Sequence, residues 1–129
     1  MANNLKIKQG FEAIKRLLTQ QTQPYNILLG ARNTTAAKQA YDALSYTKSS
    51  GGGGGGSSVT VLPCELNNLN TVKSFAKETL EKLGETKMDY LLLNAGIGGP
   101  ADQPGVLGSQ WCEPLLVNHI CEFLIFEKT

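Results

Sequence analysis

Asp89-Tyr90-Leu91-Leu92-Leu93-Asn94-Ala95-Gly96 has the composition of a buried strand that ends abruptly in a loop. Its apolar and aromatic residues follow one another without alternation, which is typical of a parallel strand covered on both faces. Asn-Ala-Gly then suits a turn and leaves the backbone open to close approach. Because open α/β sheets bind ligands beyond the carboxyl ends of their strands, we expect a binding site here. An ordinary strand-to-loop exit is the alternative from this stretch alone.

Working outward, the hydrophobic spacing predicts helices and strands that alternate along the chain. The first three are a helix over 10–20 with Phe11, Ile14, Leu17 and Leu18 at helical spacing, a strand over 25–31, and a helix over 36–44 capped by Thr34 or Thr35. A strand over 59–62 follows, and then a helix from Asn67 or Asn68 to Leu83 that is stopped by Gly84 and carries on one face Leu69, Val72, Phe75, Ala76, Leu80 and Leu83. The strand from Asp89 comes next, and the last element is a helix from Glu113-Pro114 with an apolar face of Leu115, Leu116, Ile120, Phe123 and Leu124. This order predicts an α/β domain over residues 1–129 with a parallel sheet and right-handed crossovers.

The low-complexity tract from Ser49 to Ser58 consists of glycines flanked by serines. A phosphate-binding glycine loop follows a strand and opens a helix, so that the helix amides face the anion. This tract follows a predicted helix and precedes a predicted strand. We therefore expect a flexible loop insertion at residues 49–58, on the sheet edge away from the ligand.

Composition excludes several classes of function. The 129 residues are 41% hydrophobic and 18% charged, with a net charge of +1, which indicates a globular protein without an electrostatic footprint for nucleic acid or anionic membrane. No apolar run approaches the roughly 20 residues of a membrane helix, and no signal peptide opens the chain, so we expect a cytoplasmic protein. Cys64, Cys112 and Cys121 fit reduced thiols better than disulfides or a zinc site, and no metal site is predicted.

Leu92-Leu93-Asn94-Ala95-Gly96 together with Val117-Asn118-His119 resembles the short-chain dehydrogenase/reductase family, in particular members related to the retinol dehydrogenases and protochlorophyllide reductases. The resemblance covers roughly residues 10 to 126. It implies a Rossmann-like, doubly wound parallel sheet and NADP-dependent hydride transfer between an alcohol and a carbonyl of a small-molecule substrate. The fold expected here is incomplete, because the first strand and the C-terminal catalytic half of the family pattern are missing.

The resemblance also implies a cofactor site. Gly10 matches the last glycine of the family's Thr-Gly-x-x-x-Gly-x-Gly turn, whereas Asn4 and Lys8 occupy the other two glycine positions. Arg32 lies 22 positions after Gly10, close to the spacing of a ribose-sensing residue, and an arginine there suits the 2′-phosphate of NADP. Glu65-Leu66 stands where the family has Asp-Leu at the adenine. A helix-start glycine, a solvated arginine and a solvated carboxylate are the respective alternatives.

Asn94, Ala95 and Gly96 match the family motif that supports the floor of the cofactor site. Asn118 matches the asparagine of the catalytic Asn-Ser-Tyr-Lys tetrad, where it holds a water in a proton relay. For His119 we expect a packed helix histidine rather than a catalytic role. No tyrosine is followed four positions later by lysine: Tyr25, Tyr41, Tyr46 and Tyr90 are followed by Leu29, Ser45, Ser50 and Asn94.

The chain is thus expected to be a fragment of an NADP-dependent short-chain oxidoreductase that is inactive as written. Two alternatives are a non-catalytic interaction protein and a gene-model fragment with no independent role. Open strand edges or the last helix would allow self-association of the chain. No partner nucleic acid or membrane span is expected.

Overall fold

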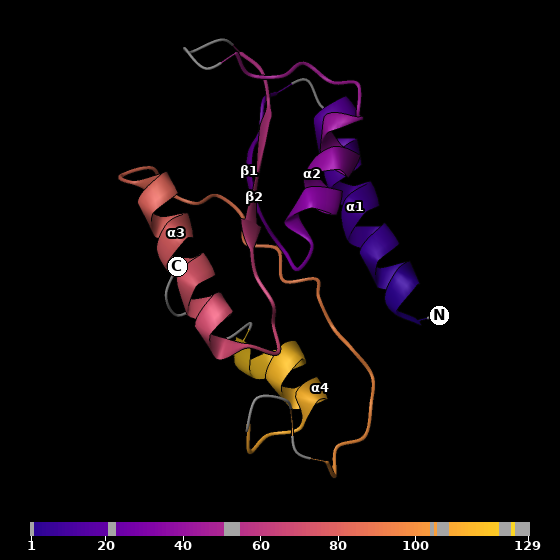
Figure 1. Cartoon of the computed structure of the whole chain (residues 1–129). Coiled ribbons are helices and arrows are strands. Elements are labelled where there is room, and N and C mark those ends of the chain that lie inside the picture. The colour runs from indigo at the N-terminus through magenta and orange to yellow at the C-terminus, as the bar shows by residue number, and fades with distance from the viewer. Residues whose placement is uncertain are drawn as a thin grey trace. The chain divides into compact units, whose positions relative to one another are not determined.

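The computed structural model describes residues 2–20, 23–50, 55–103, 105, 109–121 and 125, with side chains from residue 10 onward. Its elements are α1 (Ala2–Gln20), β1 (Asn26–Ala31), α2 (Thr34–Asp42), β2 (Ser58–Pro63), α3 (Leu69–Leu83), α4 (Glu113–Leu115) and the π-helical turn η1 (Leu116–Ile120), as Figure 1 shows. The chain divides into two compact units, Lys8–Pro63 and Met1–Ile7 with Cys64–Thr129, and each is described by itself.

The first unit contains a two-stranded parallel sheet. β1 pairs with β2 in a register that joins Asn26 to Ser58 and Ala31 to Pro63. Both strands carry the apolar and β-branched residues that pack well on a pleated surface, and α2 connects them, as two parallel strands require. The predicted α/β class with an incomplete Rossmann-like parallel sheet is confirmed.

One apolar cluster joins α1 and α2 to the sheet. Ile14, Leu18 and Tyr41 are its buried members, and the half-buried residues packed on them are Phe11, Ile27, Leu29, Leu44, Tyr46 and Val59. The rings of Phe11 and Tyr41 lie 5.1 Å apart between centroids. Figure 1 shows the two helices lying together beside the strands. Of the predicted apolar face of Phe11, Ile14, Leu17 and Leu18, this cluster contains Phe11, Ile14 and Leu18.

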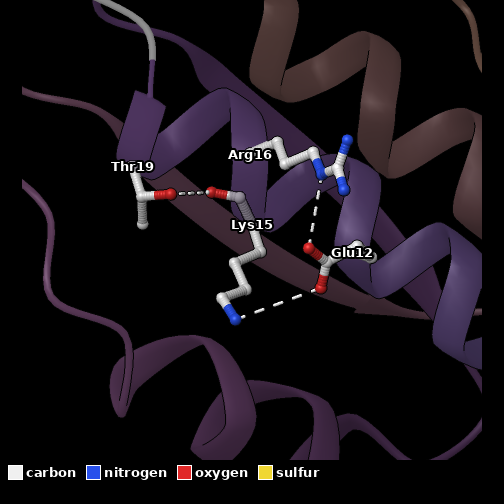
Figure 2. A network of polar contacts seen from close by, with 4 residues as sticks. All are labelled: Glu12, Lys15, Arg16 and Thr19. Atoms are coloured by element: carbon white, nitrogen blue, oxygen red, sulfur yellow. Dashed lines mark hydrogen bonds and ion pairs between the residues drawn. The ribbon is translucent and has the colours of Figure 1, made fainter.

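The opposite face of α1 carries a polar network that is open to solvent (Figure 2). Glu12 accepts a hydrogen bond from Arg16 Nε at 3.3 Å and lies 4.0 Å from Lys15 Nζ, while Thr19 Oγ1 donates to the Lys15 carbonyl at 2.7 Å. Exposed pairs at this spacing contribute only about 0.3–0.5 kcal/mol each. The network marks the outer surface of the helix rather than a binding site.

The start of α1 differs from the prediction. The helix begins at Ala2, whereas a start at residue 10 was expected, so Gly10 lies inside the helix. Leu5, Lys6 and Gln9 are good helix formers, and a single glycine costs only about 1 kcal/mol in a helix interior. Helix propensity before Gly10 therefore outweighs the break that the glycine suggested.

The caps of α2 and α3 are formed by asparagines. Asn33 Oδ1 accepts from the Ala36 amide at 3.0 Å, which makes Asn33 the cap of α2. The predicted cap at Thr34 or Thr35 is therefore wrong by one or two residues, since both threonines already lie in the helix. Asn68 Oδ1 accepts from the Asn70 amide at 3.0 Å, and Gly84 ends α3 with a φ of 55°. The predicted Asn68 cap and Gly84 stop of α3 are confirmed.

The second unit is built around a cluster that α3 shares with the last helical segment. Its buried members are Cys64, Val72, Leu116, Cys121 and Ile125, with Leu66, Leu69, Phe75 and Ile120 packed against them. Leu80 and Leu115, which were expected on buried faces, are 43% and 42% exposed. Phe123 and Leu124 were expected in the apolar face of this helix and lie outside the described residues.

The predicted strand from Asp89 to Gly96 is wrong as a buried strand. Residues 90–100 carry no strand hydrogen bonds, and Tyr90 and Leu92 are 84% and 66% exposed. A strand needs a hydrogen-bonded neighbour, and within the described part of the chain the sheet contains only β1 and β2. The run of leucines indicated burial, but Leu91 and Leu93 are still 38% and 40% exposed.

The ends of the glycine tract are ordered. Lys48 and Ser57 form a parallel bridge, Ser49 N donates to Ser57 O at 2.9 Å, and Ser57 N donates to Thr47 O at 2.9 Å. The insertion predicted for residues 49–58 overlaps β2 by one residue at its C-terminal bound, since Ser58 already belongs to that strand. Residues 51–54, at its centre, lie outside the described residues. Of the helices in the described ranges, none has the length and apolar character needed to span a membrane.

Candidate functional site

The loop that leaves β2 is held by a network around Thr71. The Glu65 amide donates to Thr71 Oγ1 at 3.0 Å, and that hydroxyl lies 2.8 Å from the Glu65 carbonyl and 2.9 Å from the Asn68 carbonyl. Leu66 packs on the core cluster of the second unit, while Glu65 stays half-buried. The backbone of the predicted adenine-side residues is thus fixed from within α3.

The segment Asn94-Ala95-Gly96 lies outside the helices and strands, with the first two residues exposed. Directly after it, the Ile97 amide donates to Asn118 Oδ1 at 2.7 Å, and Asn118 Nδ2 donates to the Ile97 carbonyl at 2.8 Å. Both backbone groups of Ile97 are therefore paired with one side chain, in the way that a neighbouring strand would pair them. Asn118 is thereby bonded to the residue that directly follows the predicted Asn94-Ala95-Gly96 motif and that lies 21 positions before it in sequence.

A π-helical turn presents Asn118. η1 spans Leu116–Ile120, and the Cys121 amide donates back to the Leu116 carbonyl across the wider turn. Leu116 and Val117 are buried, whereas Asn118 and His119 are exposed. Single π-turns recur at functional sites because they re-aim side chains out of the regular helix. The expectation that His119 is packed is wrong, since the residue is exposed.

A second polar contact ties the loop after β2 to the start of α4. Asn67 Nδ2 donates to Glu113 Oε1 at 3.1 Å, and both residues are half-buried. The amino-acid sequence does not predict this pair, because two polar residues so far apart in the chain leave no periodic signal. Pro114 in the first turn, where its missing amide costs nothing, is the feature of α4 that the sequence did predict.

The buried thiols in this unit are poor nucleophiles. Burial raises the pKa of Cys64 to about 11, with a smaller contribution from the nearby Cys121, and burial also raises the pKa of Cys121. Both thiols therefore stay protonated near neutral pH, and only a thiolate is reactive. In the described ranges, no group of three His, Cys, Asp or Glu side chains is arranged to hold a metal ion.

The first unit carries the other two predicted cofactor residues. Arg32 is exposed directly after β1, next to the Asn33 cap of α2. Gly10 lies within α1, so the glycine turn expected before this helix is not formed there. Its assignment to cofactor binding stays a prediction. The structure thus brings Asn94, Ala95, Gly96 and Asn118 together in one unit, while Arg32 and Gly10 belong to the other.

Comparison with known proteins gives a match to the short-chain dehydrogenase/reductase GME11359 of Pestalotiopsis microspora. The two sequences are 44% identical over 113 residues, which cover 88% of this chain and 36% of the relative. The chain therefore spans about a third of the length of the curated relative that it matches. No family model matches the chain. No solved structure matches it either.

Proposed function

We propose that this chain, whose sequence similarity supports the short-chain dehydrogenase/reductase family, is the cofactor-side part of an NADP-dependent oxidoreductase. In the complete protein the reaction would be hydride transfer between an alcohol and a carbonyl of a small-molecule substrate. Bound NADP would supply or accept the hydride. The residues of this chain would orient the cofactor and hold the loop beneath it.

The observation that carries this proposal is the pairing of Asn118 with Ile97. It fixes the end of the Asn94-Ala95-Gly96 segment against the π-turn, through two short hydrogen bonds. Loop residues held by a rigid scaffold are the usual carriers of binding and catalysis. Asn94, Ala95 and Gly96 would support the cofactor, and Asn118 would hold the water of a proton relay.

The preference for NADP over NAD rests on Arg32. Its guanidinium is exposed directly after β1, where a cofactor's ribose would lie in a dinucleotide-binding fold. Paired N–H donors of arginine match a phosphate and have no counterpart in a ribose hydroxyl. Arg32 therefore fits the 2′-phosphate, whereas α1 provides no glycine turn for the pyrophosphate, and Glu65-Leu66 would meet the adenine.

The finer assignment within the family rests on Val117-Asn118-His119, which favours the subgroup of the retinol dehydrogenases and protochlorophyllide reductases. We propose no turnover by the 129 residues themselves, because they contain no Tyr-x-x-x-Lys pair. A positioned acid typically contributes about 10²–10⁴ in rate. Steady NADPH oxidation with aldehydes or quinones by this chain, abolished by Asn118→Ala, would contradict the proposed inactivity.

The cofactor assignment is tested by an NMR titration of the ¹⁵N-labelled chain with NADPH and, separately, NADH. We expect NADPH to shift the amide signals of Arg32 and Asn33 and those of residues 94–96, with smaller shifts for NADH. Arg32→Ala should make the two cofactors equivalent, whereas Lys38→Ala, an exposed cation on the same helix–strand unit, should leave the difference intact. Equal shifts with both cofactors in the parent chain would remove the case for NADP.

One observation favours a second candidate, a non-catalytic protein that associates with itself. Tyr90, Leu91, Leu92 and Leu93 form an exposed apolar run outside the helices and strands. Such a segment is a template for pairing with another chain. Concentration-dependent association of this chain without any cofactor-induced shift would favour this candidate over the oxidoreductase.

A further inference from the structure

The contact between Asn67 and Glu113 joins two parts of the second unit that lie 46 residues apart in sequence. Asn67 stands in the loop between β2 and α3, two residues after Glu65. Glu113 is the first residue of α4, five residues before Asn118. A hydrogen bond from an amide to a carboxylate is about twice as strong as a hydrogen bond between two neutral groups. The hydrogen bond from Asn67 to Glu113 belongs to this stronger kind.

The Asn67 end of this contact is independently fixed. Asn68 caps α3, and Thr71 Oγ1 binds the carbonyls of Glu65 and Asn68, so the residues on both sides of Asn67 are anchored to the helix. The Asn67 amide therefore presents its N–H group from a rigid base. It does not have to order a mobile loop in order to bind the carboxylate.

The position of Glu113 determines the position of Asn118, because both residues belong to one continuous helical segment. The Leu116 amide donates to the Cys112 carbonyl at 3.0 Å, and α4 continues into η1 without a break. A displacement of Glu113 would therefore rotate or shift the π-turn that presents Asn118. The paired hydrogen bonds from Asn118 to Ile97, at 2.7 and 2.8 Å, have little room for such a shift.

We propose that Asn67 and Glu113 are positioning residues for Asn118: their contact sets the start of α4 and thereby the place at which the Asn118 amide holds Ile97. This inference rests on the proposed function only in treating Asn118 as part of the site. Two side-chain contacts, Asn67 to Glu113 and Asn118 to Ile97, then tie the loop after β2 and the loop after Gly96 to the same short helical segment.

The test exchanges donor and acceptor. Asn67→Asp sets two carboxylates against each other, and we expect the Ile97 amide to exchange with solvent about tenfold faster, as for loss of a charged hydrogen bond. The Asn118 side-chain amide signals should shift as well. Adding Glu113→Gln to Asn67→Asp restores an amide–carboxylate bond of reversed direction, and both readouts should return close to those of the parent chain.

Three further variants make the result decisive. Glu113→Gln alone keeps an acceptor for Asn67 and should change the exchange rate of the Ile97 amide little. Asn118→Ala removes the partner of Ile97 altogether and gives the largest increase in that rate that can be expected. Asn70→Asp makes the same Asn-to-Asp change on the exposed first turn of α3 and should leave Ile97 unaffected. If Asn67→Asp prevents folding, Glu113→Asp, which shortens the acceptor without repulsion, is measured in its place.

Unchanged exchange at Ile97 in Asn67→Asp, or failure of the double variant to restore it, would overturn the inference. Both readouts are taken without cofactor. A negative NADPH titration alongside restored Ile97 protection would therefore remove the proposed function and leave the positioning role standing.

Discussion

The side chain of Asn118 is hydrogen-bonded to both backbone groups of Ile97, at 2.7 Å from the Ile97 amide and 2.8 Å to its carbonyl. The single amide side chain pairs both the N–H and the C=O of Ile97, as a neighbouring strand would in a sheet. This contact gives the segment from Tyr90 to Gly96, which lies outside the helices and strands, a defined end at Ile97.

We expect Asn118→Ala to lower the free energy of unfolding by about 1–3 kcal/mol, because two backbone groups lose their partner. Urea denaturation followed by circular dichroism measures the change. His119→Ala alters the adjacent exposed residue of the same π-turn and serves as the control, with an effect within about 0.5 kcal/mol. Equal losses in the two variants would show that the turn, and not the Asn118 amide, is responsible.

Thr79 gives a prediction of opposite sign. Its side chain is only 4% exposed on α3, and within the described part of the chain its hydroxyl oxygen has no hydrogen-bond partner. Thr79→Val keeps the shape and removes a buried, unpaired hydroxyl, so we expect a gain of about 1 kcal/mol in the free energy of unfolding. Thr71→Val is the matched control, since that hydroxyl binds Glu65, and it should destabilise. A loss of stability in Thr79→Val would mean that the hydroxyl is satisfied in solution.

Cys64 links stability to alkaline pH. Burial raises its pKa from 9.0 to about 11 in the folded chain, so the unfolded thiol ionises first as the pH rises. The contribution of Cys64 to the free energy of unfolding is therefore fully present below pH 9 and is lost as the pH rises through 11. After solvent screening, we expect this loss to be about 1–2 kcal/mol. Denaturation of the parent chain and of Cys64→Ala across this range measures the difference. Parallel pH profiles would show that other groups, such as Tyr41, account for the alkaline loss.

Local signals in the sequence predicted the elements whose causes are local. The Asn68 cap, the Gly84 stop and the amphipathic face of α1 each depend on residues within a few positions, and each is found. Asn33 displaced Thr34 as a cap because the choice between adjacent cap residues depends on exact backbone angles.

Features that depend on distant residues were not predictable in the same way. The leucines from 91 to 93 indicate burial, but whether a strand forms depends on a neighbour that their own sequence does not specify. Asn118 was singled out through its family resemblance, whereas its partner Ile97 and the pair Asn67 and Glu113 were not. Polar contacts between loops have no periodicity, so only coordinates reveal them.

Of the two glycines of the tract that the structure describes, Gly56 is required by close approach and Gly55 is not. A Cβ atom on Gly56 would meet the backbone of Lys48 and would lie 2.6 Å from the Ser49 nitrogen, whereas one on Gly55 would meet nothing within 4 Å. Gly56→Ala should therefore destabilise by roughly 1–3 kcal/mol through forced backbone shifts, while Gly55→Ala should be near neutral. Thermal unfolding of the two variants measures the difference. Equal stability would mean that the bridge between Lys48 and Ser57 is open in solution.

The exposed run from Tyr90 to Leu93 predicts self-association of the chain. Tyr90 and Leu92 are the most exposed large apolar side chains in the described ranges, and an exposed apolar segment with high β-propensity tends to pair with other chains. We expect sedimentation velocity to show concentration-dependent association of the parent chain. Leu92→Lys should reduce it, because a charge in such a segment opposes edge-to-edge pairing. Ala101→Lys places the same charge on another exposed position of the following loop and should leave the association unchanged. If Leu92→Lys and Ala101→Lys reduce the association equally, the net charge of the chain is responsible. If neither variant reduces it, the association surface lies outside the run from Tyr90 to Leu93.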